Sequence, residues 1–111
     1  MTIELIQLPI ISEGDVEMVS IDFTPWLDAG ELLTGTPTVA EQTTSDLTIA
    51  NVAVSTGALT ILGDTVATGM AVQAKVSGQL LATGSYSLLV TVSTDATVAR
   101  TKKVLATFKV I

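Results

Sequence analysis

The feature that most constrains the fold of this chain is a repeated alternation of apolar residues with Thr or Ser. The clearest example is SYSLLVTVST, residues 85–94, in which Tyr86, Leu88, Val90 and Val92 share one side. A period of two is typical of a strand with one buried face, and Val and Thr suit a pleated surface better than a helix. No stretch of ten or more residues shows a convincing helical period. The alternation therefore predicts an all-β fold.

The strand pattern recurs along the chain, and Gly, Asp, Asn and Pro separate its copies. Strands are predicted over residues 17–23, 31–39, 46–55, 58–63, 69–78, 85–94 and 100–110. A change of alternation near Asn51 predicts a bulge or a local turn. Pro37 predicts an edge position or an irregular strand end, because Pro has no N–H to donate. About seven short strands in 111 residues are typical of a single β-sandwich domain.

Tyr86 sharpens this prediction, because it begins the penultimate predicted strand directly after the turn ATGS, residues 82–85. The position resembles the tyrosine corner of immunoglobulin-like domains, in which the hydroxyl group bonds to nearby backbone and fixes the crossover between sheets. We therefore predict an immunoglobulin-like β-sandwich over residues 15–111, in which Tyr86 has a structural role.

Residues 1–14 differ from the rest, since TIELIQLPII is apolar and alternating before SEGD ends the pattern. Pro9 holds the preceding residue in an extended conformation. The segment is therefore either an edge strand of its own domain or an arm that adds to the sheet edge of a neighbouring subunit. An exposed apolar arm needs a surface on which to dock. The residues predicted at such a partner interface are Ile3, Leu5, Ile6, Leu8, Ile10 and Ile11.

The segment SIDFTPWLDAGE, residues 20–31, contains the only Trp and several acidic residues. It is therefore the first place to look for an active site. The alternation turns Phe23 towards the core and Asp22 away from it, and the following Thr-Pro ends the strand. Trp26 and Leu27 are then expected to close one end of the core. These aromatic and apolar residues predict a structural role for the segment.

The acidic residues of this segment allow two interpretations. Asp28 is predicted to cap a turn in which Gly30 takes positive φ. The alternative is a hard cation bound by Asp22, Asp28 and Glu31, although their spacing is not that of an EF-hand loop. No His, Lys or Cys lies nearby in sequence to tune a carboxylate for acid–base catalysis. We predict the structural turn, with no catalytic residue, metal or cofactor.

The composition narrows the possible chemistry further. The chain has no Cys and no His, which removes thiolate sites and the commonest general base. The basic run RTKK, residues 100–103, is too short for a confident nucleic-acid patch, and the net charge of −6 argues against one. No uninterrupted apolar window of about 18 residues predicts a membrane span, and no signal-peptide pattern is present. We predict a protein that is not an enzyme and that binds neither nucleic acid nor membrane.

The charges are unevenly distributed along the chain. Residues 1–74 contain ten acidic residues and no basic one, whereas residues 75–111 contain five basic residues and one acidic residue. Strands from the two parts could neutralise one another within one fold. Alternatively, copies of the chain or unlike partners could meet with complementary potentials.

Several segments together resemble the small immunoglobulin-like accessory virion proteins of tailed bacteriophages. The first is GDVEMVSIDFTPWLDAGELLTGTPTV, with an acidic turn, a strand, an aromatic segment and an acidic Gly turn. The others are TSDLTIANVAVSTGALTILGDTV, GMAVQAKVSG and ATGSYSLLVTVSTDAT. The resemblance covers roughly residues 14–111, and its motifs are structural. Phe23 stands where such proteins often have Trp.

The resemblance implies a non-enzymatic structural protein that is made in the host cytoplasm and carried in the virion. Capsid decoration, or cementing, is the first expectation, because the apolar segment 1–14 suits binding to neighbouring subunits. A fibre-to-tail adaptor is the alternative. A carbohydrate- or surface-binding module is a weaker one, since the chain has only four aromatic residues, mostly expected in the core. The implied partners are the major capsid protein, or tail or connector proteins, together with further copies of the chain.

Overall fold

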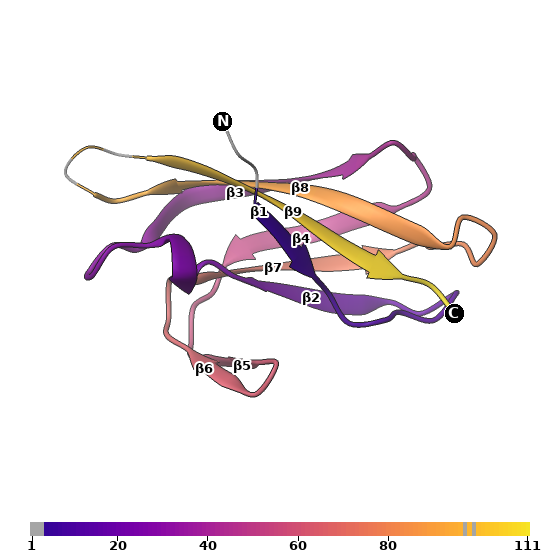
Figure 1. Cartoon of the computed structure of the whole chain (residues 1–111), viewed down its shortest axis with the longest axis horizontal. Helices are drawn as coiled ribbons and strands as arrows, with labels where there is room; N and C mark the ends of the chain where they lie inside the picture. The colour runs from indigo at the N-terminus through magenta and orange to yellow at the C-terminus, as the bar shows by residue number, and fades with distance from the viewer. Residues whose placement is uncertain (1–3, 97, 99) are drawn as a thin grey trace.

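The protein is all-β, as the alternation predicts, in a computed structural model that describes residues 4–96, 98 and 100–111. Two sheets lie face to face, and a small hairpin projects beside them (Figure 1). The elements are β1 (Glu4–Gln7), β2 (Glu17–Asp22), the 3-10 helix η1 (Thr24–Trp26), β3 (Leu33–Gln42), β4 (Thr48–Val54), β5 (Leu59–Ile61), β6 (Asp64–Val66), β7 (Ala71–Ser77), β8 (Ser85–Thr94) and β9 (Thr101–Lys109). Within these ranges no helix has the length and apolar character needed to cross a membrane.

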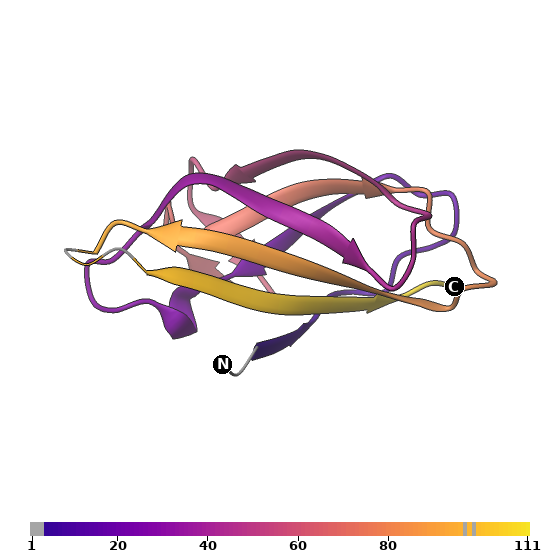
Figure 2. The same cartoon turned by 90° about the horizontal axis from the view of Figure 1, so that it is seen from above.

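The strand order shows which strands lie at the edges of the two sheets. One sheet has the order β1-β9-β8-β3, the other has the order β2-β7-β4, and β5 pairs with β6. The pairings are antiparallel except for β1, which runs parallel to β9. Seen from above, β1 lies at one margin of the upper layer and β3 at the other (Figure 2). The edge strands β1 and β2 therefore belong to different sheets.

The core lies between the two sheets, which supports a sandwich arrangement. In β8 the predicted inward residues Tyr86, Leu88, Val90 and Val92 are all at most 2% exposed. The facing sheet contributes Val19, Ile21, Val72, Ala74 and Val76 to the same cluster. Phe108 stacks on the Tyr86 ring with 5.5 Å between ring centroids. One period-two pattern in each sheet thus supplies both halves of the core.

A strand lies in each of the seven predicted ranges, but the described residues form nine strands instead of about seven. The other two are β6, which was not predicted, and β1, which lies in the segment left open as an edge strand or an arm. The predicted bulge at Asn51 is confirmed, because that residue has φ of 55° and the β4–β7 register shifts beside it. Pro37 lies in β3, an edge strand whose register also shifts between Thr34 and Thr38. The Asp-Thr-Val strand β6 is only three residues long, too short to show an alternation in the sequence.

The described part of the N-terminal segment is an edge strand of its own domain. β1 pairs with β9, and the Leu8 N–H donates a hydrogen bond to the Thr107 carbonyl oxygen at 2.7 Å. Leu8 and Ile11 are each 4% exposed and belong to the core cluster. Of the two interpretations that the sequence left open, the structure therefore has the edge strand.

Candidate interaction surface

The aromatic segment 20–31 closes one end of the core, as predicted. Phe23 is fully buried, while Asp22 is half-buried and accepts a 2.8 Å hydrogen bond from the backbone N–H two residues later. The Trp26 ring meets Phe23 edge-on, with centroids 5.8 Å apart and planes at 71°. Trp26 and Leu27 are partly buried against the core. The aromatic residues of this segment are thus used in packing.

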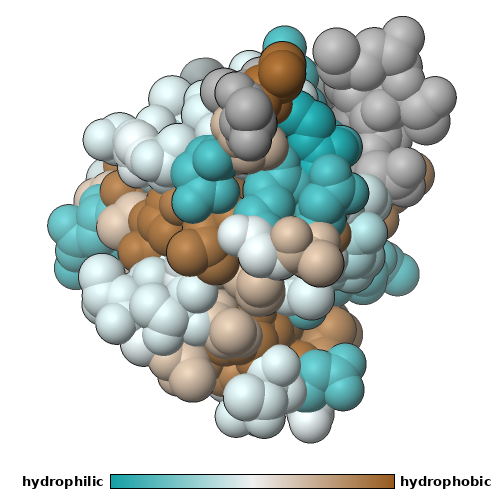
Figure 3. All heavy atoms as spheres, turned by 90° about the vertical axis from the view of Figure 1, so that its left-hand side faces the viewer, coloured by the Kyte–Doolittle hydropathy of each residue, from teal (hydrophilic) through white to brown (hydrophobic). Residues whose placement is uncertain are grey.

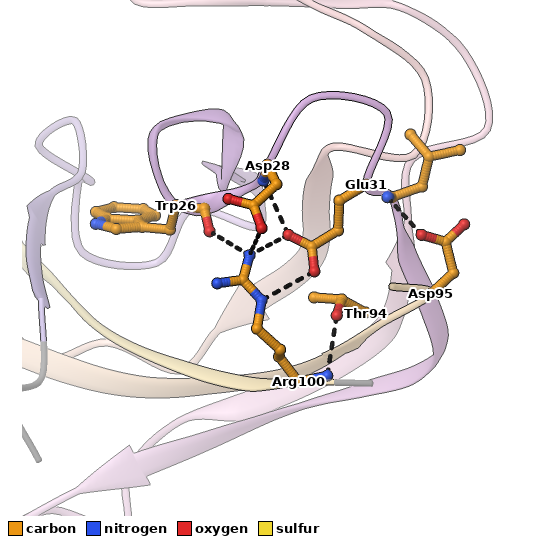
Figure 4. A network of polar contacts seen from close by, with 7 residues as sticks. Trp26, Asp28, Glu31, Thr94, Asp95 and Arg100 are labelled. Carbon is orange, nitrogen blue, oxygen red and sulfur yellow. Dashed lines mark hydrogen bonds and ion pairs between the residues drawn. The ribbon is translucent and has the colours of Figure 1, made fainter. Parts of the chain in front are cut away.

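The acidic residues of the same segment meet Arg100, a residue that the sequence did not connect with them. Figure 4 shows the guanidinium group between Glu31, Asp28 and the backbone of Trp26. Arg100 Nε donates a hydrogen bond to Glu31 Oε2 at 3.0 Å, and Nη2 donates to Glu31 Oε1. Arg100 Nη2 also lies 3.4 Å from Asp28 Oδ2. The Glu31 side chain is only 2% exposed. Its buried carboxylate therefore has a charged partner, the Arg100 guanidinium group, that binds both of its oxygens.

The turn itself is capped differently from the prediction. Gly30 has φ of 78°, as expected, but the carboxylate that accepts the backbone bond belongs to Glu31. The Asp28 N–H donates to Glu31 Oε1 at 2.9 Å, while the Asp28 carboxylate is directed to Arg100. The predicted cap by Asp28 is therefore wrong, because the guanidinium group attracts its carboxylate and leaves the turn to Glu31.

Hydrogen bonds from Arg100, and then from the Asp28 backbone, lower the pKa of Glu31 to about 2. The bond to Glu31 in turn raises the pKa of Arg100. Both partners therefore remain charged at neutral pH. A carboxylate that stays ionised at pH 7 has no proton to donate as a general acid, and its low pKa makes it a weak general base. In the described part of the chain, no group of three His, Cys, Asp or Glu side chains is placed to hold a metal ion.

The polar cluster also joins two chain connections. The Leu32 N–H donates to Asp95 Oδ1 at 2.8 Å, and the Asp95 N–H donates back to the Leu32 carbonyl oxygen at 3.0 Å. The Arg100 N–H donates to Thr94 Oγ1 at 3.1 Å. Figure 3 views this end of the molecule, where apolar surface is interrupted by polar residues. The cluster thus fastens the start of β3 to the ends of β8 and β9, which is a structural task.

The predicted structural role of Tyr86 rests on its hydroxyl group. The Leu80 N–H donates a 2.9 Å hydrogen bond to this oxygen, and the hydroxyl donates to Asp46 Oδ2 at 2.8 Å. The predicted bond to nearby backbone is therefore confirmed. The bond to Asp46, 40 positions away, also ties the β3–β4 connection to the turn before β8.

A groove of about 290 Å³ lies between the N-terminal segment, β2 and the tip of the β5–β6 hairpin. It is lined by residues 6–11, 17–20 and 60–62. Glu17 is the only ionisable residue among them. Three of the apolar lining residues, Ile10, Met18 and Leu62, are 59%, 51% and 76% exposed. A groove bordered by exposed apolar side chains is typical of a surface that binds another molecule.

The five described residues among those predicted at a partner interface fall into three groups. Leu5 and Ile10 are exposed, Ile6 is half-buried, and Leu8 and Ile11 are buried in the chain's own core. Ile3 lies outside the described residues. Leu8 and Ile11 do not belong to one alternation, since they are three positions apart and Ile10 is exposed. Each is instead held against β9 separately, by the hydrogen bonds of the Leu8 N–H to the Thr107 carbonyl oxygen and of the Ile11 N–H to the Lys109 carbonyl oxygen. Their buried side chains do not present themselves to a partner in this structure.

The groove includes apolar residues that sequence reasoning missed. Met18 faces away from the core on an edge strand, and Leu62 lies in the β5–β6 turn with φ of 51°. The sequence did contain one signal for Met18, because it is an apolar residue at a position where the alternation predicts an outward-facing side chain. The hairpin brings Leu62 to the same groove from 44 positions further along the chain, which no local pattern indicates.

Comparison of the chain with protein family models, curated protein sequences and solved structures found no match. The groove and the sheet edges beside it are therefore the features from which a function can be inferred.

Proposed function

We propose that this chain is a non-enzymatic structural protein of a bacteriophage virion, which decorates the capsid and binds neighbouring subunits. The observation that carries the proposal is the apolar groove beside the free edge of β2. Exposed apolar residues gathered at an open strand edge are an aggregation hazard for an isolated protein. Burial in an assembly removes that hazard, so the surface suits a chain that works in contact with neighbours.

The immunoglobulin-like interpretation of the body is part of this proposal. Two facing sheets and the hydrogen bond between the Leu80 backbone and the Tyr86 hydroxyl support it. In immunoglobulin-like domains the equivalent Tyr lies at the start of the penultimate strand, and Tyr86 is the second residue of β8. Such a sandwich is a rigid body that offers its edges and loops for binding.

The charges support association with copies or unlike partners. Arg100 is the one basic residue that forms salt bridges within the described ranges, and its acidic partners lie in the first half of the chain. The other basic residues, Lys75, Lys102, Lys103 and Lys109, form none with described residues. Their charges, and those of the exposed acids, are thus available for complementary contacts between subunits.

The direct test uses particles of the phage whose genome carries this sequence. Gradient-purified virions are dissolved in denaturant, separated by gel electrophoresis and identified by mass spectrometry. We expect the chain in many copies per particle, since decoration follows the repeating capsid lattice. Its absence from the purified particles would contradict the proposal.

Location within the particle separates decoration from the fibre-to-tail adaptor. Cryo-electron microscopy of the same particles is expected to show density for the nine-strand body on the capsid surface. Density for it only at the tail would support the adaptor function instead. Both results are read from the same images, so the head-bound and tail-bound alternatives are compared directly.

A further inference from the structure

We propose that the groove receives an extended, basic and apolar segment of an unlike partner protein, which pairs with the free edge of β2 as an added strand. Its apolar side chains alternate into the groove, and a Lys or Arg lies beside Glu17. That the partner is a neighbouring virion subunit rests on the proposed function. The chemical character of the bound segment is inferred from the groove alone.

The first support is the unpaired edge of β2, whose only strand partner in the described sheets is β7. The Phe23 N–H donates to the carbonyl oxygen of Met70, the residue before β7, at 2.9 Å, so the N–H of Phe23 points to the β7 side of β2. Backbone groups alternate along an antiparallel ladder. Val19 therefore turns its N–H and C=O groups towards β7, and Met18 and Ser20 turn theirs away.

Met18 and Ser20 both line the groove, so their outward backbone groups lie at its wall. A row of free N–H and C=O groups beside an apolar depression is what an added strand requires. Four consecutive residues of β2, 17–20, line the groove. At roughly 3.3 Å per residue this length accepts a partner segment of about four to six residues.

The second support is the arrangement of apolar groups around that edge. Ile10 and Leu62 are exposed residues of two walls of the groove, one formed by the N-terminal segment and one by the hairpin. An extended segment presents every second side chain to the same face. Alternate Val, Leu, Ile or Phe side chains of a partner can thus cover both walls while its backbone pairs with β2.

The third support is charge, which selects the partner. Glu17 is the only ionisable residue in the lining, and the exposed acids Glu13 and Asp15 precede it. Lys75 is the register neighbour of Met18 on β7, and it is an exposed residue of the same sheet. It is the one base close to this acidic stretch in the β2–β7 ladder. Glu17, as the ionisable residue of the lining, favours a partner segment that carries Lys or Arg beside it.

A second copy of this chain fits the groove less well. Its N-terminal segment has the right alternation but brings Glu4, a like charge for Glu17. Its basic strand, β9, is already paired on both sides by β1 and β8 and has no free edge. The occupant is therefore expected from a different protein.

The test uses fluorescent, acetylated and amidated peptides, KVTVTV, KLTLTL, KITITI and KFTFTF, titrated into the full chain and followed by anisotropy. We expect saturable binding by at least one. Replacing its Lys by Glu is expected to weaken binding about tenfold, since an attraction to Glu17 becomes a repulsion. N-methylation of its two central residues is expected to abolish binding, because it removes backbone donors and blocks pairing.

Matched variants of the chain locate the site. Glu17→Gln is expected to reduce the difference between the Lys and Glu peptides to less than about twofold, whereas Asp15→Asn leaves the difference unchanged. Met18→Lys is expected to weaken binding about tenfold or more, because it places a charge at the edge and in the groove. Thr48→Lys, on the opposite edge of the same sheet, should bind as the unmodified chain does. Circular dichroism confirms that each variant is folded.

Four results would overturn the inference: no saturable binding by any of the four peptides, equal binding of Lys and Glu peptides, undiminished binding by N-methylated peptides, or a self-associated dimer in ultracentrifugation that Met18→Lys dissociates. The last result would assign the groove to a second copy. None of them bears on whether the chain is present in purified virions, so failure of this inference and failure of the proposed function are distinguishable.

Discussion

Glu31 and Arg100 lie 69 positions apart in the sequence and form a partly buried, two-pronged ion pair. The carboxylate follows the turn after η1, and the guanidinium group comes from the residue before β9. Because the Arg100 side chain is 33% exposed and the Glu31 side chain only 2%, the buried partner depends on the more exposed one. The pair connects the η1 turn to the β8–β9 connection.

The ion pair predicts a specific dependence of stability on pH. The pKa of Glu31 is lowered from 4.5 to about 2 by the hydrogen bonds described above. A carboxyl group whose pKa is lower in the folded state contributes stability that is fully present above its unfolded pKa. We therefore expect the contribution to be complete above about pH 5, to fall as the pH drops from about 4.5, and to vanish below about pH 2.

The measurement is urea unfolding of the unmodified chain and of Glu31→Gln between pH 7 and pH 2. The difference in unfolding free energy between the two should shrink across that range. Arg100→Met is the companion variant, and at pH 7 it should destabilise more than Glu31→Gln, because it leaves a buried carboxylate without its partner. A stability difference between the unmodified chain and Glu31→Gln that does not change with pH would contradict the assignment.

A pair of leucines tests whether the N-terminal segment is an integral strand. Leu8→Ala is expected to lower the unfolding free energy by about 2–5 kcal/mol, because it opens a cavity in the core. Leu5→Ala removes a side chain that is 71% exposed and should change stability by less than about 0.5 kcal/mol. Both are measured by urea unfolding. Equal, small effects would show that the segment does not pack as described here.

Tyr86→Phe isolates the contribution of the hydroxyl group. The substitution keeps the ring that stacks on Phe108 but leaves the Leu80 N–H and the Asp46 carboxylate without that partner. We expect a loss of about 1–3 kcal/mol in unfolding free energy. Thr83→Val is the control, because Thr83 makes an exposed 3.1 Å bond to the same carboxylate, and it should cost less than about 0.5 kcal/mol. A Tyr86→Phe protein as stable as the unmodified one would refute the structural role.

Two glycines with similar backbone conformations allow the energetic cost of backbone strain to be measured separately from the cost of a steric clash. Gly78 and Gly14 have φ of 88° and 84°, but a Cβ at Gly78 would lie 2.6 Å from the Asp46 carbonyl oxygen, while one at Gly14 would meet nothing within 4 Å. Gly14→Ala should cost about 1–2 kcal/mol for the left-handed conformation. Gly78→Ala should cost about 1–3 kcal/mol more, since backbone must move. Thermal and urea unfolding give both values, and equal losses would contradict the close approach.

The sequence predicted the parts of the fold that local patterns encode. The alternation in Tyr86, Leu88 and Val90 marks one buried face, and a strand needs no distant information to show it. The Asn51 bulge was visible for the same reason, because it interrupts a local period. The all-β class, the positions of seven strands and the inward residues of β8 therefore follow from the sequence alone.

The rest depends on which strands become neighbours. Nothing near Glu31 in sequence announces Arg100, since the two meet only after β8 and β9 have paired and placed the β8–β9 connection beside the η1 turn. The groove likewise needs the hairpin residue Leu62 to approach Met18. The N-terminal segment alternated in a way that fitted an edge strand and an arm equally well, and only its pairing with β9 distinguishes them.

The parallel pairing of β1 with β9 has a consequence for synthesis. Among the described strands, β1 comes first in the sequence, and its only strand partner, β9, comes last. Contacts between such distant positions form late in folding, because the entropy cost of closing a long loop comes before the contacts contribute any stability. Leu8 and Ile11 therefore remain exposed to water in the nascent polypeptide until residues 104–110 have emerged from the ribosome.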